Sequence, residues 1–482
     1  MRVVKNYLYN VGYQVLAIIV PLITSYYVSR VLSPEGVGAN AFTNSVIQYF
    51  MLLANIGIGY YGNREIAYVR DNKQKMAATF WEIQIVKTVM TVVAYLSFVV
   101  FMAFYSGNKT YMWAQSINLI AVAFDISWLY QGLEDFKRTV LRNTFVKIIS
   151  MIAIFIFIKS PKDVALYIIV LALSTLLGNL TLWPHAVNNY GHVDRGTKLN
   201  PWRHFVPTVT MFVPQIATQL YVQLNRTMLG LMVNEKAAGF YQYSDNIVKL
   251  ILAFVTATGT VMLPHVANAF AQHDMEKVHK MLYKSFDFVS ALAYPMMFGI
   301  AGVSLTLAPL YYSSEYAPVG PAMLIESIVI LMIGWSNVIG TQYLIPINRV
   351  KDFTTSVTLG AVVNIVLNFP LIHFLGLNGA MWSTVFSEIA VTAYQLFVIR
   401  KALNVKIMVK NTWKYLVSGM IMFIPVYWLN VHMGRSWVWL FIEILIGAVI
   451  YTAMVFLLRA PVVDQLRELL KKISFRKLNK TR

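Results

Sequence analysis

The sequence predicts an all-α polytopic membrane protein with about 14 transmembrane helices. The chain of 482 residues is 58% hydrophobic and only 13% charged, with a mean hydropathy of +0.59, which is far from the composition of a soluble domain. Long apolar runs recur along the chain, and a segment that crosses lipid must satisfy its own backbone as a helix. Lysine and arginine gather in alternate connections between these runs. We therefore expect one membrane domain, although the length alone suggests about three soluble domains.

Fourteen apolar runs are candidate spans, and each is expected to be helical. The first run is interpreted as a retained span, because it is too long for a signal-peptide core and no A-x-A-like site follows it. The spans are expected near residues 8–30, 40–60, 83–105, 113–130, 145–159, 164–184, 207–232, 241–263, 286–310, 321–346, 354–375, 379–399, 413–431 and 437–458.

The distribution of basic residues predicts the topology. With an even number of spans both termini lie on one side, and that side holds 31 of the 40 Lys and Arg residues. The positive-inside rule then predicts that both termini are cytoplasmic. The net charge of +19 is therefore a signal of topology and of contact with anionic membrane lipids, and we expect no nucleic-acid partner. The basic tail, 459–482, is interpreted either as an interfacial amphipathic helix or as a solvated charged segment.

The seventh run, 207–233, is the most informative one, because it is long and apolar enough to span a membrane and yet carries four polar residues. Gln215, Gln219, Gln223 and Arg226 follow one another at spacings of four, four and three residues, which places them on one face of a helix. An arginine at membrane depth costs roughly 2.5–3.5 kcal/mol on insertion scales. We expect this face to line a water-filled pathway, and interhelical hydrogen bonding within the bundle is the alternative.

Two further spans carry polar stripes, so we expect the first, second, seventh and eighth spans to line one cavity. In the eighth span Asp245 and Lys249 are four residues apart and could simply neutralise each other. The stripe of the second span consists of Asn40, Asn44, Gln48 and Asn55, and that of the eighth of Gln242, Asp245, Lys249, Thr256 and Thr260.

A weak internal repeat relates the stretches that begin SPEGVGANAFTN and NEKAAGFYQYSD, so that Gly38 aligns with Gly239 and Asn44 with Asp245. An offset of six spans predicts parallel halves related by an axis along the membrane normal. We expect an N-terminal six-helix lobe at 1–206, a C-terminal six-helix lobe at 207–400, two additional helices at 401–458 and the basic cytoplasmic tail.

Three intramembrane carboxylates are candidates for ion coupling: Asp125, Asp245 and Glu326. A carboxylate in a dry cavity can carry a proton, whereas structural ion pairs between helices are the alternative. The chain has no cysteine, its histidines do not cluster, and it contains neither a Walker A motif nor a Rossmann glycine fingerprint. We therefore expect no cofactor, no metal site and no enzymatic activity, and we expect an ion gradient, substrate disposition or a partner to supply the energy.

Several segments closely resemble the Wzx-type polysaccharide transporters of the multidrug/oligosaccharidyl-lipid/polysaccharide exporter superfamily. The most specific are YGNRE (Tyr61–Glu65) and WLYQGLEDFK (Trp128–Lys137). The opening KNYLYNVGYQVLAIIVPLITSYYVSRVLSPEGVGANAF, VPQIATQLYVQLNRTMLGLM and SNVIGTQYLIPINRVKDFTTSV also match. The resemblance extends from the N-terminus to about residue 400, and the last two spans match only in hydropathy.

The resemblance implies a flippase in the bacterial cytoplasmic membrane with two six-helix lobes in a V and two additional helices. Such a protein moves oligosaccharide repeat units linked to undecaprenyl diphosphate to the outer leaflet for capsule, exopolysaccharide or O-antigen assembly. It alternates between inward-open and outward-open states around a cationic cavity, and polysaccharide polymerase and chain-length proteins are its implied partners.

Basic residues suit a diphosphate head group, because arginine pairs with phosphate oxygens bidentately. We expect Arg64 and Lys87 to receive the head group on the inner side, and Arg226, Lys249 and Arg30 to lie toward the outer half. For Arg64 the alternative is a positive-inside anchor at the end of its span.

Other functions remain as alternatives. A multidrug exporter of the same superfamily would favour an acidic, aromatic cavity, and a lipid II flippase has closely similar head-group chemistry. A membrane-embedded polymerase or glycosyltransferase would need a large loop with a convergent acid/base set, and no segment between spans exceeds about 25 residues. A scaffold protein would leave the polar stripes unexplained.

Overall fold

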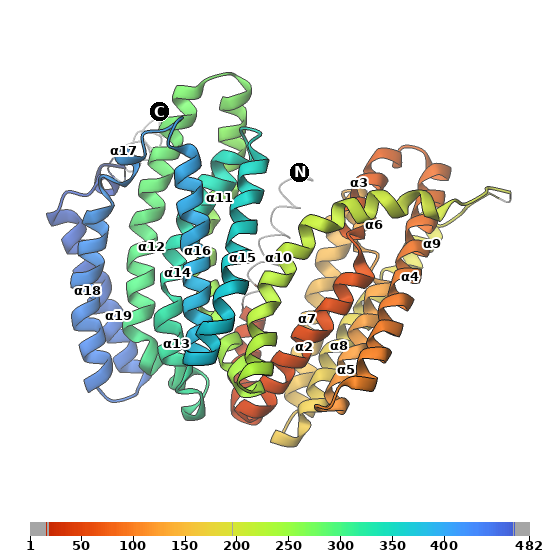
Figure 1. Cartoon of the computed structure of the whole chain (residues 1–482), viewed down its shortest axis with the longest axis horizontal. Coiled ribbons are helices and arrows are strands. Elements are labelled where there is room, and N and C mark those ends of the chain that lie inside the picture. The colour runs from red at the N-terminus through yellow and green to blue at the C-terminus, as the bar shows by residue number, and fades with distance from the viewer. Residues whose placement is uncertain (1–15, 17–18, 195, 466, 468–482) are drawn as a thin grey trace, which may run out of the picture. The chain divides into compact units, whose positions relative to one another are not determined.

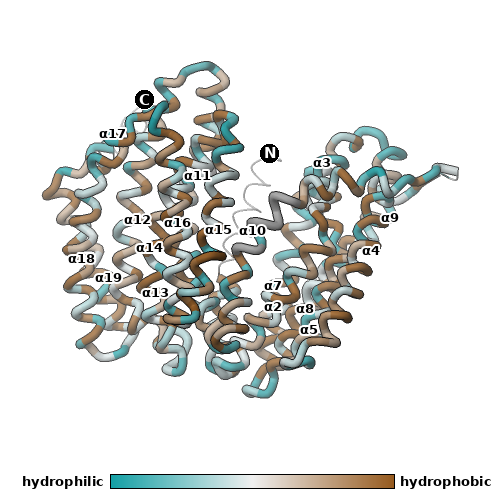
Figure 2. The backbone as a smooth tube through the Cα atoms, viewed as in Figure 1, coloured by the Kyte–Doolittle hydropathy of each residue, from teal (hydrophilic) through white to brown (hydrophobic). Residues whose placement is uncertain are grey.

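The computed structural model describes residues 16, 19–194, 196–465 and 467, and the regular secondary structure of these residues is helical throughout (Figure 1). Eleven helices among them are long and apolar enough to cross a membrane. Most hydrophobic residues lie within the helices, and many hydrophilic residues lie in the connections between them (Figure 2). The predicted all-α polytopic class is confirmed.

The eleven helices correspond to the second, third, fifth, sixth and eighth to fourteenth predicted spans. The fourth predicted span is α5, Lys109–Phe124, with 16 residues, and the seventh is α10, Phe205–Met232. Neither belongs to the eleven. The first predicted span begins outside the described residues, and residues 19–31 of it are helical.

Contacts between residues divide the chain into two compact units, Met1–Gly239 and Phe240–Arg482. In the first unit α10 packs against α2 and α3. The lobe boundaries expected from the sequence stay a prediction, because packing alone does not say which helices move as one body. The helices of the first unit are α2 (Pro34–Asn55), α3 (Ile58–Val69), α4 (Lys73–Phe104), α5, α6 (Ser127–Gly132), α7 (Phe136–Phe157), α8 (Val164–Leu180), α9 (Trp183–Tyr190) and α10.

A glycine turn separates α2 from α3 within what reads as a continuous apolar run. Gly57 has φ +82°, a conformation that suits glycine because it has no Cβ. A Cβ at this position would also lie 2.9 Å from the carbonyl oxygen of Thr208 and 3.0 Å from the amide nitrogen of Phe212. The turn therefore both ends α2 and lets α10 approach the backbone.

The second unit is built on two helices of 37 residues, α11 and α12. At 1.5 Å per residue each is about 55 Å long, well beyond the ~30 Å hydrocarbon core of a bilayer. Part of each helix must therefore extend out of the membrane. The elements are α11 (Glu235–Ala271), α12 (Met275–Tyr311), α13 (Val319–Glu326), α14 (Ile328–Ser336), the π-helix η4 (Asn337–Leu344), α15 (Val350–Leu375), α16 (Leu377–Ile399), α17 (Val405–Val409), α18 (Thr412–His432) and α19 (Trp437–Leu457).

The two additional helices, α18 and α19, are joined to α12 by buried hydrogen bonds. Tyr415 donates from its hydroxyl to the Asp287 carboxylate, with both oxygens at 3.0 Å. Tyr451 donates to the Ala291 carbonyl at 2.8 Å. Because an unsatisfied buried polar group is costly, these contacts attach the last two helices firmly to the second unit.

Candidate functional site

The predicted polar stripe lies on α10 in the first unit. Gln219 is exposed, Gln223 is buried and Arg226 is partly buried. The side chain of Gln215 lies outside the described residues. Residues three or four apart share one face of a helix, so Gln219, Gln223 and Arg226 line the same side of α10.

Close contacts to α2 hold this helix in place. The Thr227 hydroxyl lies 2.9 Å from the Ser45 hydroxyl and 3.0 Å from the Tyr49 hydroxyl. Gly230 faces the ring of Phe42 so closely that a Cβ there would lie 2.1 Å from it. Thr227 and Gly230 therefore fix the position of α10, the helix that carries Arg226, against α2.

The polar residues of α2 separate into two groups. Asn40 accepts a hydrogen bond from Gln115 of α5 at 3.1 Å, and Gln115 accepts one from Asn118 at 2.9 Å. Asn40 therefore belongs to the interior of the unit. Asn44 and Gln48, like Asn40, are partly exposed, and they lie on the helix against which α10 packs.

The two motifs that carry the family resemblance pack against each other. A Cβ on Gly62 would lie 2.5 Å from the indole of Trp128, and one on Gly132 would lie 2.7 Å from the carbonyl oxygen of Asn63. These glycines let α3 and α6 come into contact at this close range. Arg70 and Glu134 add an exposed ion pair at 2.8 Å, and that pair raises the pKa of Arg70 above its ordinary value.

Arg64 lies at the surface of α3. Its guanidinium is 2.9 Å from the Glu65 carboxylate, and its side chain is 40% exposed. The rings of Tyr61 and Tyr68 lie 5.4 and 5.9 Å from the guanidinium carbon, within the range of cation–π attraction. Arg64 is thus accessible and partly neutralised.

Arg30, predicted for the outer half, is exposed at the end of the helix 19–31. Its guanidinium stacks 3.6 Å from the centre of the Tyr26 ring, and it donates to the Tyr26 carbonyl at 2.8 Å.

Lys87 lies inside the first unit, not on an accessible surface. Its side chain is 1% exposed, and its ammonium donates to the carbonyl oxygen of Asp125. The Asp125 carboxylate accepts from the Ser127 amide at 3.0 Å and hydroxyl at 2.6 Å, and it lies 4.0 Å from Arg142. That Lys87 receives a head group stays a prediction, which its burial disfavours. Asp125 has two cations near it, Lys87 of α4 and Arg142 of α7.

A buried carboxylate cluster that the sequence did not bring together lies five residues before Lys87 on α4. The Glu82 side chain is 3% exposed and lies 2.6 Å from Arg203 and 2.8 Å from His204. It also accepts from the Asn200 amide at 2.7 Å, and the Tyr61 hydroxyl lies 2.7 Å from His204 Nδ1. The cluster ties the connection before α10 to α3 and α4. Asn200, Arg203 and His204 lie more than 100 residues from Glu82 along the chain, so no local spacing could have revealed the cluster.

The second unit contains a separate charged cluster at the start of α11. Lys249 and Asp245 form the i,i+4 pair at 2.8 Å. Ser244 donates to the buried carboxylate of Glu326 on α13 at 2.5 Å, and Glu326 interacts with Asp245 and Lys249. Lys249 thus lies near both carboxylates, and its side chain is half exposed, at 52%.

Taken one unit at a time, the structure brings together two polar sets. The first unit offers neutral amides and Arg226 on α2 and α10, and the second offers Asp245, Lys249 and Glu326. Amides and arginine can hydrogen-bond sugars and phosphates. Within the described part of the chain, no group of three or more His, Asp or Glu side chains converges to hold a metal ion.

The fold and these polar helix faces define a polytopic helical membrane protein. A family model described as "Polysaccharide biosynthesis protein" matches residues 3–270, more than half of the chain. The chain therefore belongs to this family, and the resemblance to the Wzx-type polysaccharide transporters is confirmed.

Relatives with described roles agree with this family. A "Putative O-antigen transporter" of Escherichia coli (strain K12) is 22% identical over 403 residues, which are 82% of this chain and 96% of that protein. The "Lipid II flippase MurJ" of Bacillus subtilis (strain 168) is 26% identical over 188 residues, which are 38% of this chain and 35% of that protein.

Solved structures show the same fold. The lipid II flippase MurJ in an inward closed conformation aligns with a TM-score of 0.75 at 14% identity, covering 94% of this chain and 99% of that one. An inward-facing multidrug resistance MATE family transporter aligns with a TM-score of 0.62 at 16% identity, covering 79% of this chain and 93% of that one. At these identities the likeness concerns the fold alone.

Proposed function

We propose that the protein is a flippase for undecaprenyl-diphosphate-linked oligosaccharide repeat units. It moves them from the cytoplasmic to the outer leaflet of the bacterial cytoplasmic membrane by alternating access, for capsule, exopolysaccharide or O-antigen assembly. The observation that carries the proposal is the polar face of α10, with Gln219, Gln223 and Arg226 in a helix docked on α2. Family membership supports the polysaccharide context.

The chemistry of the cargo explains why such a face is needed. A diphosphate that enters hydrocarbon without partners loses its hydration at a cost of tens of kcal/mol by Born estimates. Arginine replaces water with bidentate charge-assisted hydrogen bonds. The accessible amides of Asn44, Gln48 and Gln219 can both donate and accept, which suits sugar hydroxyls of many geometries.

The two ends of the pathway have different candidates. Arg64, 40% exposed and held among tyrosines, is proposed to receive the head group from the cytoplasm. Arg226 is proposed to hold it deeper in the membrane, and Arg30 and Lys249 to act on the outer half. In the second unit Asp245 and Glu326 are proposed as candidates for ion coupling, because two carboxylates lie close together beside Lys249.

The test is leaflet exchange of a fluorescent undecaprenyl-diphosphate oligosaccharide in proteoliposomes. We expect wild-type protein to accelerate exchange and Arg226→Ala to slow it about ten- to a hundredfold, because a hydrogen bond to a charged group contributes about 1.5–3 kcal/mol. Arg226→Lys retains the charge without the planar fork and should fall between the two. Arg435→Ala, which removes an exposed arginine between α18 and α19, is the matched control.

Arg64 has a second internal control in Arg70. Arg64 lies within α3 and Arg70 directly after its end. Both are 40% exposed, and both pair with a glutamate. Arg64→Ala should slow exchange, and Arg70→Ala should not. Equal exchange by Arg64→Ala, Arg226→Ala and wild-type protein would refute the cationic pathway.

A lipid II flippase is the second candidate, since the lipid II flippase MurJ is both a relative and a structural neighbour. The same assay with lipid II in place of the oligosaccharide lipid separates the two. Faster exchange of lipid II than of every lipid-linked oligosaccharide offered would favour this candidate.

A further inference from the structure

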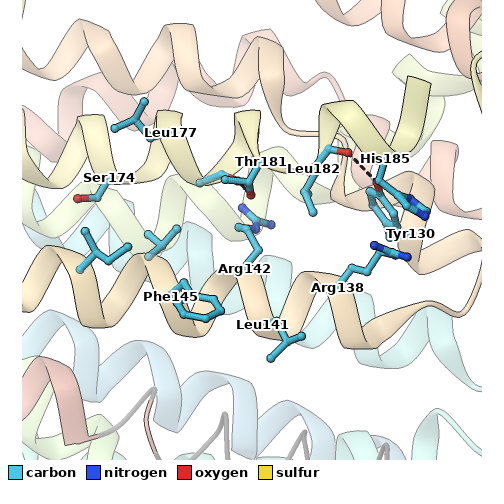
Figure 3. Close-up of a pocket in the computed structure, with 13 residues that line it drawn as sticks. Tyr130, Arg138, Leu141, Arg142, Phe145, Ser174, Leu177, Thr181, Leu182 and His185 are labelled. Atoms are coloured by element: carbon cyan, nitrogen blue, oxygen red, sulfur yellow. Dashed lines mark hydrogen bonds between the residues drawn. The ribbon is translucent and has the colours of Figure 1, made fainter. Parts of the chain in front are cut away.

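A groove between α7 and α8 of the first unit lies apart from the polar stripes. Its cavity has a volume of about 460 Å³, within the usual range for sites of small ligands. Tyr130, Arg138 and His185 lie together at one end, and Arg142 lies farther along the groove (Figure 3). The opposite end is lined mainly by apolar side chains.

The cationic end is built into the fold. Arg142 donates to the Asn179 side chain of α8 and lies 4.0 Å from Asp125, so its guanidinium is fixed in the wall of the groove. Arg138 is 43% exposed and donates to Asp135 at 2.8 Å. None of the described residues that line the groove is acidic.

The apolar side chains of the groove are exposed. Phe145, Ile149 and Leu177 line it and are 56–61% exposed. Val146 and Gly178 bring the two helices together, since a Cβ on Gly178 would lie 2.1 Å from the Val146 side chain. The groove is therefore amphiphilic, with fixed positive charge at one end and exposed hydrocarbon at the other.

We propose that this groove binds an anionic glycerophospholipid of the cytoplasmic leaflet. Its phosphate pairs with Arg138 and Arg142, and one acyl chain lies along Phe145, Ile149 and Leu177. The positive-inside prediction puts the start of α7 on the cytoplasmic side, where basic pockets between transmembrane helices attract anionic head groups. The site requires no particular cargo, so it stands or falls independently of the proposed flippase function.

Photocrosslinking tests the site directly. The full-length protein is reconstituted with phosphatidylglycerol or phosphatidylcholine that carries a diazirine in one acyl chain, and adducts are mapped by peptide mass spectrometry. We expect phosphatidylglycerol to label peptides of α7 and α8 at least fivefold more than phosphatidylcholine. Arg138→Gln should lower that labelling about fivefold, equivalent to about 1 kcal/mol for one basic residue near the membrane surface.

Matched variants separate binding from misfolding. Arg70→Gln removes a similarly exposed, similarly paired arginine outside the groove and should leave labelling unchanged. Ile149→Trp fills the apolar end and should abolish labelling, whereas Ile156→Trp, on the same helix and equally exposed at 57%, should not. Equal labelling by both phospholipids, or by Arg138→Gln and wild type, would overturn the proposal. So would displacement of the label by undecaprenyl phosphate more readily than by unlabelled phosphatidylglycerol, which would assign the groove to the carrier lipid.

Discussion

Replacing Glu82 by alanine should loosen the connection that precedes α10 without touching the polar stripe. Glu82 lies on α4 and accepts from three groups of the segment 200–204: Arg203 at 2.6 Å, His204 at 2.8 Å and the Asn200 amide at 2.7 Å. This segment leads directly into α10, so the cluster anchors the start of the helix that carries Arg226.

The size of the effect follows from the exposure of each partner. His204 is buried, so its imidazole loses a partner that water cannot replace, at a cost of about 1–3 kcal/mol. The Arg203 side chain is half exposed at 53%, and a solvated ion pair contributes about 0–1 kcal/mol. Asn200 is exposed, so water can take over much of its amide bond. The expected loss is about 3 kcal/mol, toward the lower end of the range for breaking a buried pair.

Hydrogen exchange and thermal unfolding in detergent measure this prediction. In Glu82→Ala the amides of residues 200–208 should exchange roughly a hundredfold faster, and the midpoint of unfolding should fall. Glu134→Ala removes an exposed glutamate of the same unit and serves as the control. Unchanged protection of 200–208 in folded Glu82→Ala would show that the cluster does not hold this segment, and the reasoning from burial would be refuted.

Two other substitutions test the first unit. Lys87→Met should lower the free energy of unfolding by about 3 kcal/mol, because it removes the buried cation beside Asp125. The unfolding temperature and the rate of leaflet exchange should then fall together. Unfolding at the wild-type temperature with lost exchange would instead make Lys87 a substrate contact. Gly62→Ala should lower the free energy of unfolding by about 1–3 kcal/mol through overpacking against Trp128, measured by thermal unfolding. Gly59→Ala on the same helix should be tolerated, because a Cβ there has no neighbour closer than 3.9 Å. Equal unfolding temperatures of the two variants would contradict the importance of the close contact at Gly62.

The class of fold was accessible from the sequence because its cause is local. A segment in lipid must close its own hydrogen bonds, and apolar length therefore reports helices directly. The same holds for the Asp245–Lys249 pair, since residues four apart on a helix are neighbours. The structure forms that pair at 2.8 Å.

The breaks within the apolar runs could not be predicted from the sequence in the same way. The turn at Gly57 is stabilised by the approach of α10 from about 150 residues away, and the π-helix Asn337–Leu344 interrupts a run that reads as one span. Nothing in the hydropathy marks either position. Tertiary contact decides where these helices end, so hydropathy predicts the span but not the bend within it.

The lysines within the predicted spans show most clearly what the sequence alone does not predict, namely which side chains are buried. Lys87 and Lys249 both read as cations in a span, yet Lys87 is 1% exposed and the Lys249 side chain is 52% exposed. Lys87 finds its partner 38 residues away, at Asp125, a distance at which no helical spacing applies. A buried cation is tolerated only where such partners compensate its lost hydration. Burial therefore distinguishes a lysine enclosed in the bundle from a lysine with an exposed side chain, and we expect Lys87 to support the fold and Lys249 to be the one that a substrate can reach.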